Sequence, residues 1–168
     1  RHDMYKDYKA NRPEMPEELQ LQLPHLWEIL EAMNIPVLKK VGVEADDIIG
    51  TLAVNADQDG LDTYIVSGDK DFMQLINDHI FLYAPGTKRA PEPIVYDSIK
   101  VEKKWGVPPE KIIDFLGLMG DSSDNVPGVA GVGEKTAVKL IKEYGSLEGA
   151  LHNAEKVAKK RARNGLIE

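Results

Sequence analysis

The chain contains no cysteine, and this absence removes several classes of chemistry. A protein without cysteine has no disulfide scaffold, no thiolate nucleophile and no zinc cluster built on sulfur. Such a composition fits the reducing cytosol, so we expect a cytoplasmic protein. Any metal site in this chain should therefore use oxygen ligands.

Long apolar runs are also missing. No stretch approaches the roughly 20 apolar residues that a membrane-spanning helix needs, and we find neither an internal repeat nor a long polar tract. The 168 residues are 42% hydrophobic, which suits one globular domain or one domain with a small appendage. The chain begins at Arg1 inside a helix-like stretch, without an initiator methionine or a signal peptide, so we expect a fragment of a longer protein.

The charge of the chain is unevenly distributed. The formal net charge of −7 argues by itself against nucleic-acid binding, which depends on neutralising phosphates. However, residues 44 to 71 contain eight carboxylates and one lysine, whereas residues 1–12 and 156–163 are basic. An acidic centre between basic segments differs from a uniformly acidic surface.

Hydrophobic periodicity predicts an α/β fold, with a mostly parallel sheet flanked by helices. We expect an α/β unit over residues 1–97 and a helical subdomain over residues 98–168. The expected helices cover residues 1–12, 16–33, 45–56, 108–120 and 134–144, with a short helix ending at residue 76. The expected strands cover residues 37–41, 63–66, 80–83 and 94–96.

Three of these elements carry specific expectations about burial. The second helix should bury a face that includes Leu26 and Ile29 and should kink at Pro24. The third helix should bury Ile48, Ile49, Leu52 and Ala53. The continuous apolar strand 63–66 should be covered on both faces.

Three groups of acidic residues lie in loops beyond the carboxyl ends of strands, where α/β folds commonly carry their functional residues. Each group alone has a structural explanation, as a helix start, a turn former or a helix stop. Together they would place many carboxylates at close range, which calls for divalent cations such as Mg²⁺ and suits a two-metal attack on a phosphodiester. An EF-hand is excluded because the twelfth position, with Asp121 counted as the first, is Val132 and not the required glutamate. The groups are Glu44, Asp46 and Asp47; Asp69 and Asp71; Asp121 and Asp124.

A glycine-rich segment follows the third acidic group. Residues 128–136 nearly spell a phosphate-binding P-loop, but Glu134 separates Gly133 from Lys135 and no strand precedes the segment. We interpret it as a hairpin between two helices, in which Gly131 and Gly133 let the backbone approach a DNA phosphate. Lys135 and Thr136 would add a charge and a hydroxyl group. A connector without a ligand is the alternative.

Residues 1–12 combine basic and aromatic side chains. Arg1, Tyr5, Tyr8 and Arg12 follow helical spacing, with Lys9 beside the tyrosines. Such a stripe suits the bases and phosphates of a nucleic-acid strand, although a solvated helix with inward tyrosines would give the same pattern. The basic residues of segment 156–163 are most simply a solvated helix face.

These motifs occur in an order that resembles the 5′-to-3′ exonuclease domains of bacterial DNA polymerases I, within the flap endonuclease family. The resemblance rests on Tyr8-Lys9 with Arg12, on residues 42–47, on Ser67-Gly68-Asp69-Lys70-Asp71, and on residues 120–128 and 131–137. It extends over essentially the whole chain.

The resemblance implies a PIN-like nuclease core over residues 1–97 and a helix-hairpin-helix element at about residues 112–144. It implies a metal-dependent hydrolase of DNA that cuts 5′ flaps or 5′ ends and removes RNA primers. The seven carboxylates would hold two Mg²⁺ or Mn²⁺ ions. Lys9 and Arg12 would contact the scissile phosphate from a helical gateway at residues 1–33, and Arg1, Tyr5 or Tyr8 would contact the strand.

The resemblance also implies a duplex-binding role for Gly131, Gly133, Lys135 and Thr136, with a K⁺ ion bound there in some family members. Two further aspartates of the family pattern would lie upstream of Arg1, together with a first strand, so we expect weak activity from this chain alone. A polymerase region could follow Glu168. The competing hypotheses are a non-catalytic DNA-binding module and, less favoured, a P-loop nucleotidase.

Overall fold

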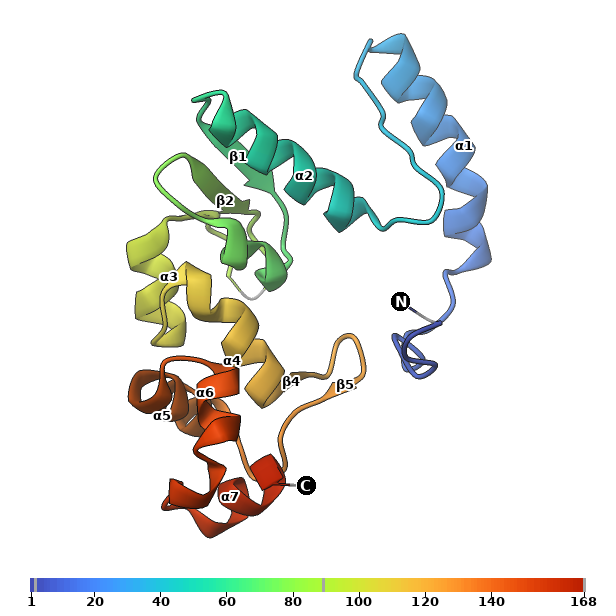
Figure 1. Cartoon of the computed structure of the whole chain (residues 1–168). Helices are drawn as coiled ribbons and strands as arrows, with labels where there is room; N and C mark the ends of the chain where they lie inside the picture. Colours follow the sequence, from blue (N-terminus) through green and yellow to red (C-terminus); the bar gives the residue numbers. More distant parts are fainter. Residues whose placement is uncertain (2, 89, 168) are drawn as a thin grey trace.

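The computed structural model describes residues 1, 3–88 and 90–167. In the described residues, a three-stranded sheet packs against helices, and a helical C-terminal half lies beside it (Figure 1). The helices are α1 (Glu17–Ala32), α2 (Ala45–Gln58), α3 (Ser98–Trp105), α4 (Ile112–Met119), α5 (Glu134–Tyr144), α6 (Leu147–His152) and α7 (Lys160–Ile167). Short 3₁₀ helices are η1 (Lys70–Leu75), η2 (Pro109–Lys111) and η3 (Ala154–Lys156).

The sheet has the strand order β1 (Thr63–Val66), β2 (Ile80–Ala84), β3 (Ile94–Tyr96). Strands β1 and β2 are parallel, with Ile65 opposite Leu82, whereas β2 and β3 are antiparallel, with Leu82 opposite Tyr96. All three strands were expected from the sequence. The β1–β2 pair places the loop that follows β1 at the same edge as the carboxyl end of β2.

One face of the sheet builds the core. Ile65, Ile80 and Leu82 are buried, and they share one continuous apolar cluster with Phe115 and Leu118 of α4. Removing this much apolar surface from water is the main source of stability in a domain of this size. The cluster therefore joins the sheet to the C-terminal helices.

The opposite face of β1 is exposed, so the expectation that this strand is covered on both faces is wrong for the described residues. Tyr64 and Val66 are exposed at 58% and 67%. Tyr64 stacks on Phe81 of β2, with ring centroids 5.1 Å apart. An apolar run therefore occurs here in a strand that packs on one side.

Helix α2 begins where the sequence predicted, but it buries less than expected. Ala53 is buried, Ile48 and Ile49 are half-buried, and Leu52 is exposed. The expected burial of Leu52 is wrong, since the residue is 49% exposed.

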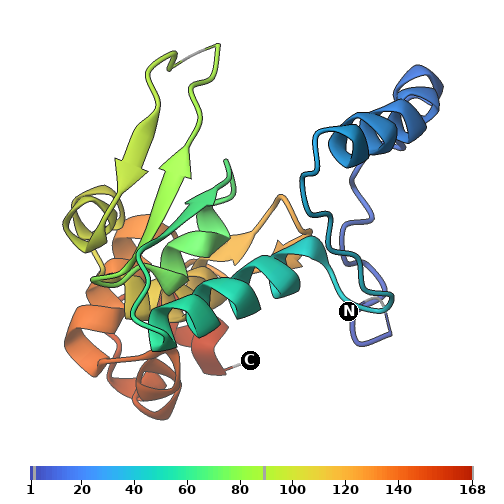
Figure 2. The ribbon, with the colours of Figure 1, turned by 90° about the horizontal axis from the view of Figure 1, so that it is seen from above.

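Helix α1 has no buried residue, which contradicts the expected apolar face against the core. Leu26 and Ile29 are exposed, and Pro24 lies inside the helix. Figures 1 and 2 show α1 standing apart from the sheet and from the C-terminal helices. No helix in the described residues is long and apolar enough to cross a membrane.

Two other expected elements are absent from the described residues. Segment 37–41 is not a strand, because it pairs with no other strand there. The expected helix over residues 1–12 is a series of turns instead, in which Lys9 has a φ of 57° and donates its backbone N–H to the carbonyl of Asp124. That left-handed residue and that outside bond interrupt a helical ladder.

The C-terminal half contains one element that the sequence did not predict. Strands β4 (Gly120–Asp121) and β5 (Val126–Pro127) form a short antiparallel hairpin inside the stretch expected to be irregular. Beyond it, α5 coincides with the expected helix 134–144.

Candidate active site

The loop after β1 holds two carboxylates in fixed positions. The hydroxyl of Ser67 accepts a hydrogen bond from the N–H of Asp69 at 3.0 Å, and Oδ1 of Asp69 accepts one from the N–H of Asp71 at 2.9 Å. The second bond caps the N-terminus of η1. Both aspartates therefore lie just beyond the carboxyl end of a parallel strand.

The start of α2 supplies three more acidic residues. Glu44 and Asp47 form a capping box, in which the N–H of Glu44 donates to Oδ2 of Asp47 at 2.9 Å. Asp46 lies between them in the first turn. A motif that begins a helix thus also fixes the direction of its acidic side chains.

The β4–β5 hairpin carries the third acidic group. The N–H of Ser123 donates to Oδ1 of Asp121 at 2.8 Å, and the turn brings Asp124 back toward residues 1–12. Asn125 takes a left-handed conformation there, with a φ of 58°, and its side chain donates to the carbonyl of Asp7 at 2.8 Å.

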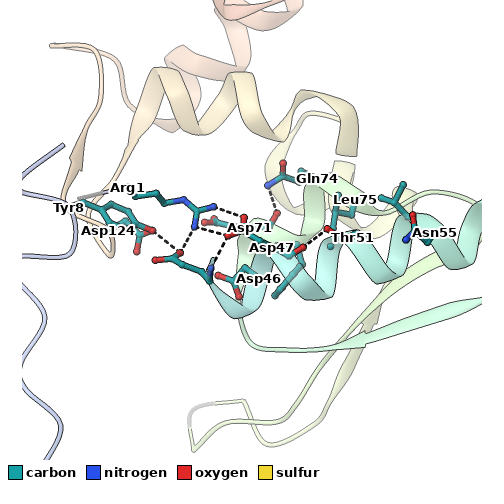
Figure 3. A pocket seen from close by; sticks show the side chains of 14 residues that line it. Arg1, Tyr8, Asp46, Asp47, Thr51, Asn55, Asp71, Gln74, Leu75 and Asp124 are labelled. Atoms are coloured by element: carbon teal, nitrogen blue, oxygen red, sulfur yellow. Dashed lines mark hydrogen bonds and ion pairs between the residues drawn. The ribbon is translucent and has the colours of Figure 1, made fainter. Parts of the chain in front are cut away.

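The structure brings all seven predicted carboxylates around two adjoining hollows. The larger, about 670 Å³, is lined among others by Glu44, Asp46, Asp47, Asp71 and Asp124 (Figure 3). The smaller, about 340 Å³, is lined by Asp69, Asp71, Asp121 and Asp124, among others. Because Asp71 and Asp124 line both hollows, three segments far apart in the sequence form one acidic site.

Four cationic side chains lie among these carboxylates. Arg1 contacts Asp47 at 2.8 Å and Glu44 at 2.7 Å. Lys9 lies 3.0 Å from Glu44, Arg12 lies 2.7 Å from Asp124, and Lys70 lies 2.6 Å from Asp121. Three of these four cations come from residues 1–12, so the basic start of the chain folds onto its acidic centre.

Tyr8 joins two of the acidic groups. Its hydroxyl lies 3.1 Å from both Glu44 and Asp124, and the residue is buried, with 8% exposure. Tyr5, at 36% exposure, donates its hydroxyl to the carbonyl of Asn125 at 3.0 Å. The two tyrosines therefore differ in how much ring surface they offer to a ligand.

The cations hold three of the carboxyls in their charged form. Hydrogen bonding by Arg1 lowers the pKa of Asp47. Burial alone would raise the pKa of Asp121 and of Glu44, but Lys70 and Ser123 together outweigh it at Asp121, and Lys9, Tyr8 and Arg1 together outweigh it at Glu44. The pKa of each is therefore below its ordinary value.

Two carboxyls have the opposite shift. Burial raises the pKa of Asp71, and the charges of Asp69, Asp121 and Asp124 raise it further against the opposing effect of Lys70. Although Asp46 is largely exposed as a residue, desolvation of its carboxyl and then the charge of Asp69 raise the pKa of Asp46. These two carboxyls lack sufficient positive charge nearby.

The donor set fits a hard divalent cation. Oδ1 of Asp71 is buried without a hydrogen bond, and its nearest cation, Nζ of Lys70, is 3.6 Å away. A buried carboxylate oxygen without a donor is costly, and a bound cation would compensate it. In the described part of the chain, however, no three acidic or histidine side chains are spaced as a ready-made metal site.

The predicted duplex-binding residues lie at the start of α5. Gly131 has a φ of 79° and packs against Arg161 of α7, while Gly133 is extended with open space around its Cα. Lys135 is exposed, and the hydroxyl of Thr136 accepts a hydrogen bond from Lys159 at 3.1 Å. Helices α4 and α5 flank this segment, as expected for a helix-hairpin-helix element.

Sequence reasoning missed two residues. Lys70 stands inside the motif of residues 67–71, where its place between Asp69 and Asp71 was a usable signal. Lys159, assigned to a solvated face, donates to the carbonyl of Gly131 at 3.0 Å and so joins the hairpin. No local spacing links residue 159 to residue 131.

Family models match both halves of the chain. The model of the N-terminal resolvase-like domain of 5′-3′ exonucleases matches residues 1–106, and the model of their C-terminal SAM fold matches residues 107–168. The chain belongs to the 5′-3′ exonuclease family. The family resemblance inferred from the sequence is thus confirmed.

Relatives of this chain include both long and short proteins. It is 45% identical over 168 residues to DNA polymerase I of Bacillus subtilis, covering all of this chain and 19% of that protein. It is 44% identical over 156 residues to a 5′-3′ exonuclease of Aquifex aeolicus, covering 93% of this chain and 52% of that protein. The chain therefore spans about a fifth of the polymerases and about half of the separate exonuclease.

Solved structures of low identity show the same fold. The bacteriophage T5 D15 protein, crystallised with metal ions, is 22% identical with a TM-score of 0.77 over 98% of this chain and 63% of the phage protein. The catalytic core of Rad2, in complex with a DNA substrate, is 22% identical with a TM-score of 0.59 over 92% of this chain and 50% of that one.

Proposed function

We propose that this chain supplies the catalytic site of a 5′-3′ exonuclease and flap endonuclease, which hydrolyses phosphodiesters of DNA that has a 5′ end or a 5′ flap. RNA primers paired with DNA are the second proposed substrate. The observation that carries the proposal is the convergence of seven carboxylates from three separate segments around Asp71 and Asp124. Because the chain belongs to the 5′-3′ exonuclease family, we interpret these converging carboxylates as a nuclease active site.

The proposed cofactor is a pair of Mg²⁺ or Mn²⁺ ions. Asp46, Asp47 and Asp71 would hold one ion beside the larger hollow, and Asp69, Asp121 and Asp124 would hold the other, with Glu44 linking the first group to Lys9. When bound, such ions supply an activated water and stabilise negative charge on the attacked phosphate. Metal ions in the T5 D15 structure support this assignment.

The chain's own cations would position the DNA. Lys9 and Arg12 lie at the rim of the acidic site and would bind the scissile phosphate once it competes for them with Glu44 and Asp124. Arg1 would contact the strand in the same way. Tyr5 has more exposed ring surface than Tyr8 for stacking on a base, so we assign stacking to Tyr5 and the positioning of Glu44 and Asp124 to Tyr8.

The start of α5 would hold the duplex. Gly133 leaves its backbone open, and Lys135 adds an exposed charge beside it, so both suit a phosphate. Gly131 and Thr136 would shape this segment. A K⁺ ion is a further proposed ligand here, and these two residues would offer it oxygen atoms. At present the ammonium of Lys159 bonds to both, so a K⁺ ion would have to replace it.

Continuity with a polymerase region is a proposal supported by the DNA polymerase I relatives. Such a protein would act in replication and repair, in the cytoplasm at the bacterial nucleoid.

A cleavage assay tests the proposed activity. The natural protein that contains these 168 residues should cut a 5′-flap duplex in Mg²⁺, and Asp69→Asn should reduce cleavage by several orders of magnitude while DNA affinity stays similar. Asp78→Asn, an exposed carboxylate elsewhere, is the matched control. Full DNA affinity without any metal-dependent cleavage would favour the non-catalytic binding module instead.

A binding assay tests the duplex contact separately. Lys135→Ala should weaken duplex binding about equally for all sequences and reduce the salt slope by about one counterion. Lys103→Ala on α3 is the control for a lost surface charge. An unchanged salt slope would remove Lys135 from the interface.

A further inference from the structure

Lys70 lies inside the smaller hollow, on the same loop as two of its carboxylates. Its ammonium is 2.6 Å from Oδ2 of Asp121 and 3.6 Å from Oδ1 of Asp71. Arg1, Lys9 and Arg12 belong to residues 1–12, whereas Lys70 is anchored between Asp69 and Asp71 in η1. Its charge therefore stays with the acidic loop whatever the start of the chain does.

The surroundings of Lys70 show what its charge does. Asp69, Asp71, Asp121 and Asp124 all line this hollow, and the side chain of Lys70 is 27% exposed. Oδ1 of Asp121 accepts from Ser123, so Lys70 is the partner of the remaining oxygen. The orphaned Oδ1 of Asp71 faces the same ammonium at a distance too long for a hydrogen bond.

We propose that Lys70 is a built-in competitor for the divalent metal: its ammonium occupies the Asp71–Asp121 side of the smaller hollow and must move away before a metal ion binds there. The proposal rests on the proposed metal-dependent function and adds a residue that sets its metal requirement. A tethered cation reduces the electrostatic gain of binding a second cation at the same oxygens. Lys70 therefore sets the affinity of the smaller hollow for the metal ion without being one of its ligands.

A competitor role and a purely structural role predict opposite effects of removing Lys70 on metal affinity. If Lys70 only held Asp121 in place, its removal would weaken metal binding. Because it competes, its removal should strengthen metal binding while it destabilises the metal-free protein, in which Asp71 and Asp121 lose the ammonium that faces them. Tighter metal binding together with lower stability of the metal-free protein would therefore identify the competitor role.

The test compares Mn²⁺ binding by calorimetry in the natural protein and in Lys70→Met, Lys70→Gln and Lys70→Arg variants. We expect one Mn²⁺ site to bind about tenfold more tightly in Lys70→Met and Lys70→Gln, and no change in Lys70→Arg. Without metal, both neutral variants should melt at a lower temperature than the natural protein, and Mn²⁺ should raise their melting temperatures more. Lys111→Met is the matched control, because Lys111 forms a comparable ion pair with Asp114, 3.5 Å apart, outside both hollows.

The outcomes separate this inference from the proposed function. If Mn²⁺ binds the natural protein but not Asp71→Asn, and neither neutral Lys70 variant binds it more tightly, the metal site stands and the competitor role is wrong. If neither the natural protein nor any variant binds Mn²⁺, the proposed metal-dependent function itself is wrong. Equal tightening in Lys111→Met would show a general charge effect and would also overturn the role of Lys70.

Discussion

At the scale of the residue, Asp71 has the least favourable surroundings among the carboxylates of the site. One of its oxygens is buried without a hydrogen bond, and three other aspartates raise its pKa in addition to burial. A raised pKa means that the charged form is less stable in the folded than in the unfolded chain. Ionised Asp71 therefore reduces the stability of the metal-free protein at neutral pH.

Asp71→Asn should consequently raise the melting temperature of the metal-free protein at pH 7, by about 2 °C after allowance for solvent screening. The gain should shrink as the pH falls through the raised folded-state pKa of Asp71 and vanish below the ordinary aspartate pKa of about 3.9, where the carboxyl is protonated in both states. Mn²⁺ should stabilise the natural protein but not the variant. Thermal melts with and without chelator measure all three effects, and a lower melting temperature of the variant in chelator would contradict the prediction.

At the scale of the element, the segment before α5 distinguishes two glycines. A Cβ on Gly131 would lie 2.4 Å from Cγ of Arg161, and the φ of 79° is unfavourable for alanine. Gly131→Ala should therefore cost about 2 kcal/mol of unfolding free energy. Gly133 is extended and open, so Gly133→Ala should leave stability unchanged and affect only duplex binding.

Urea unfolding monitored by circular dichroism measures the stability difference, and duplex titration measures the binding. Equal destabilisation by both substitutions would show that the segment tolerates no side chain at either position. Equal stability of both would mean that α7 yields to a methyl group at residue 131.

The parallel strands β1 and β2 are linked at their starts by a titratable pair. Nδ1 of His79 lies 2.8 Å from Oδ1 of Asp62, and this hydrogen bond raises the pKa of His79. The stabilisation is therefore complete below the ordinary histidine pKa of about 6.5 and is lost as the pH rises through the raised value.

NMR titration should give His79 a pKa above 6.5, and Asp62→Asn should return it to the ordinary range. An identical pKa of His79 in both proteins would exclude the contact with Asp62.

Local patterns predicted the elements that depend on neighbouring residues. The bounds of α5 and the start of α2 follow from periodicity and capping, and the three strands follow from short apolar runs. Local patterns failed where a distant partner decides the conformation: the carbonyl of Asp124 bonds to Lys9 and turns the expected first helix into a series of turns. Segment 37–41 has strand-like composition but no partner strand among the described residues.

The seven acidic residues could be found as a set because each group lies at a recognisable helix start, strand end or helix end, and the family resemblance placed them in order. Their pairing with particular cations could not be found. Arg1 and Asp47 are 46 positions apart, and Lys70 and Asp121 are 51 apart. Their metal-ligand and DNA-binding roles remain predictions.

At the scale of the whole molecule, the net charge of −7 conceals an internal neutralisation. The basic residues 1–12 lie against the acidic centre, so the average says little about the surface that meets DNA. The division of the chain at residues 97 and 98 remains a prediction. The matches to the two family models meet between residues 106 and 107, just after α3.

Helix α1 stands outside the apolar cluster that joins the sheet to the C-terminal helices. Its amides should therefore exchange with solvent deuterium through local opening, without global unfolding, while those of α4, which buries Phe115 and Leu118, should exchange near the global limit. Exchange followed by mass spectrometry should show α1 labelled first by at least a hundredfold, given about 3 kcal/mol between the two opening free energies. Equal protection would mean that α1 shares the cooperativity of the core. The expected difference instead makes α1 a part of the molecule that unfolds and refolds more than about a hundred times for each opening of the core.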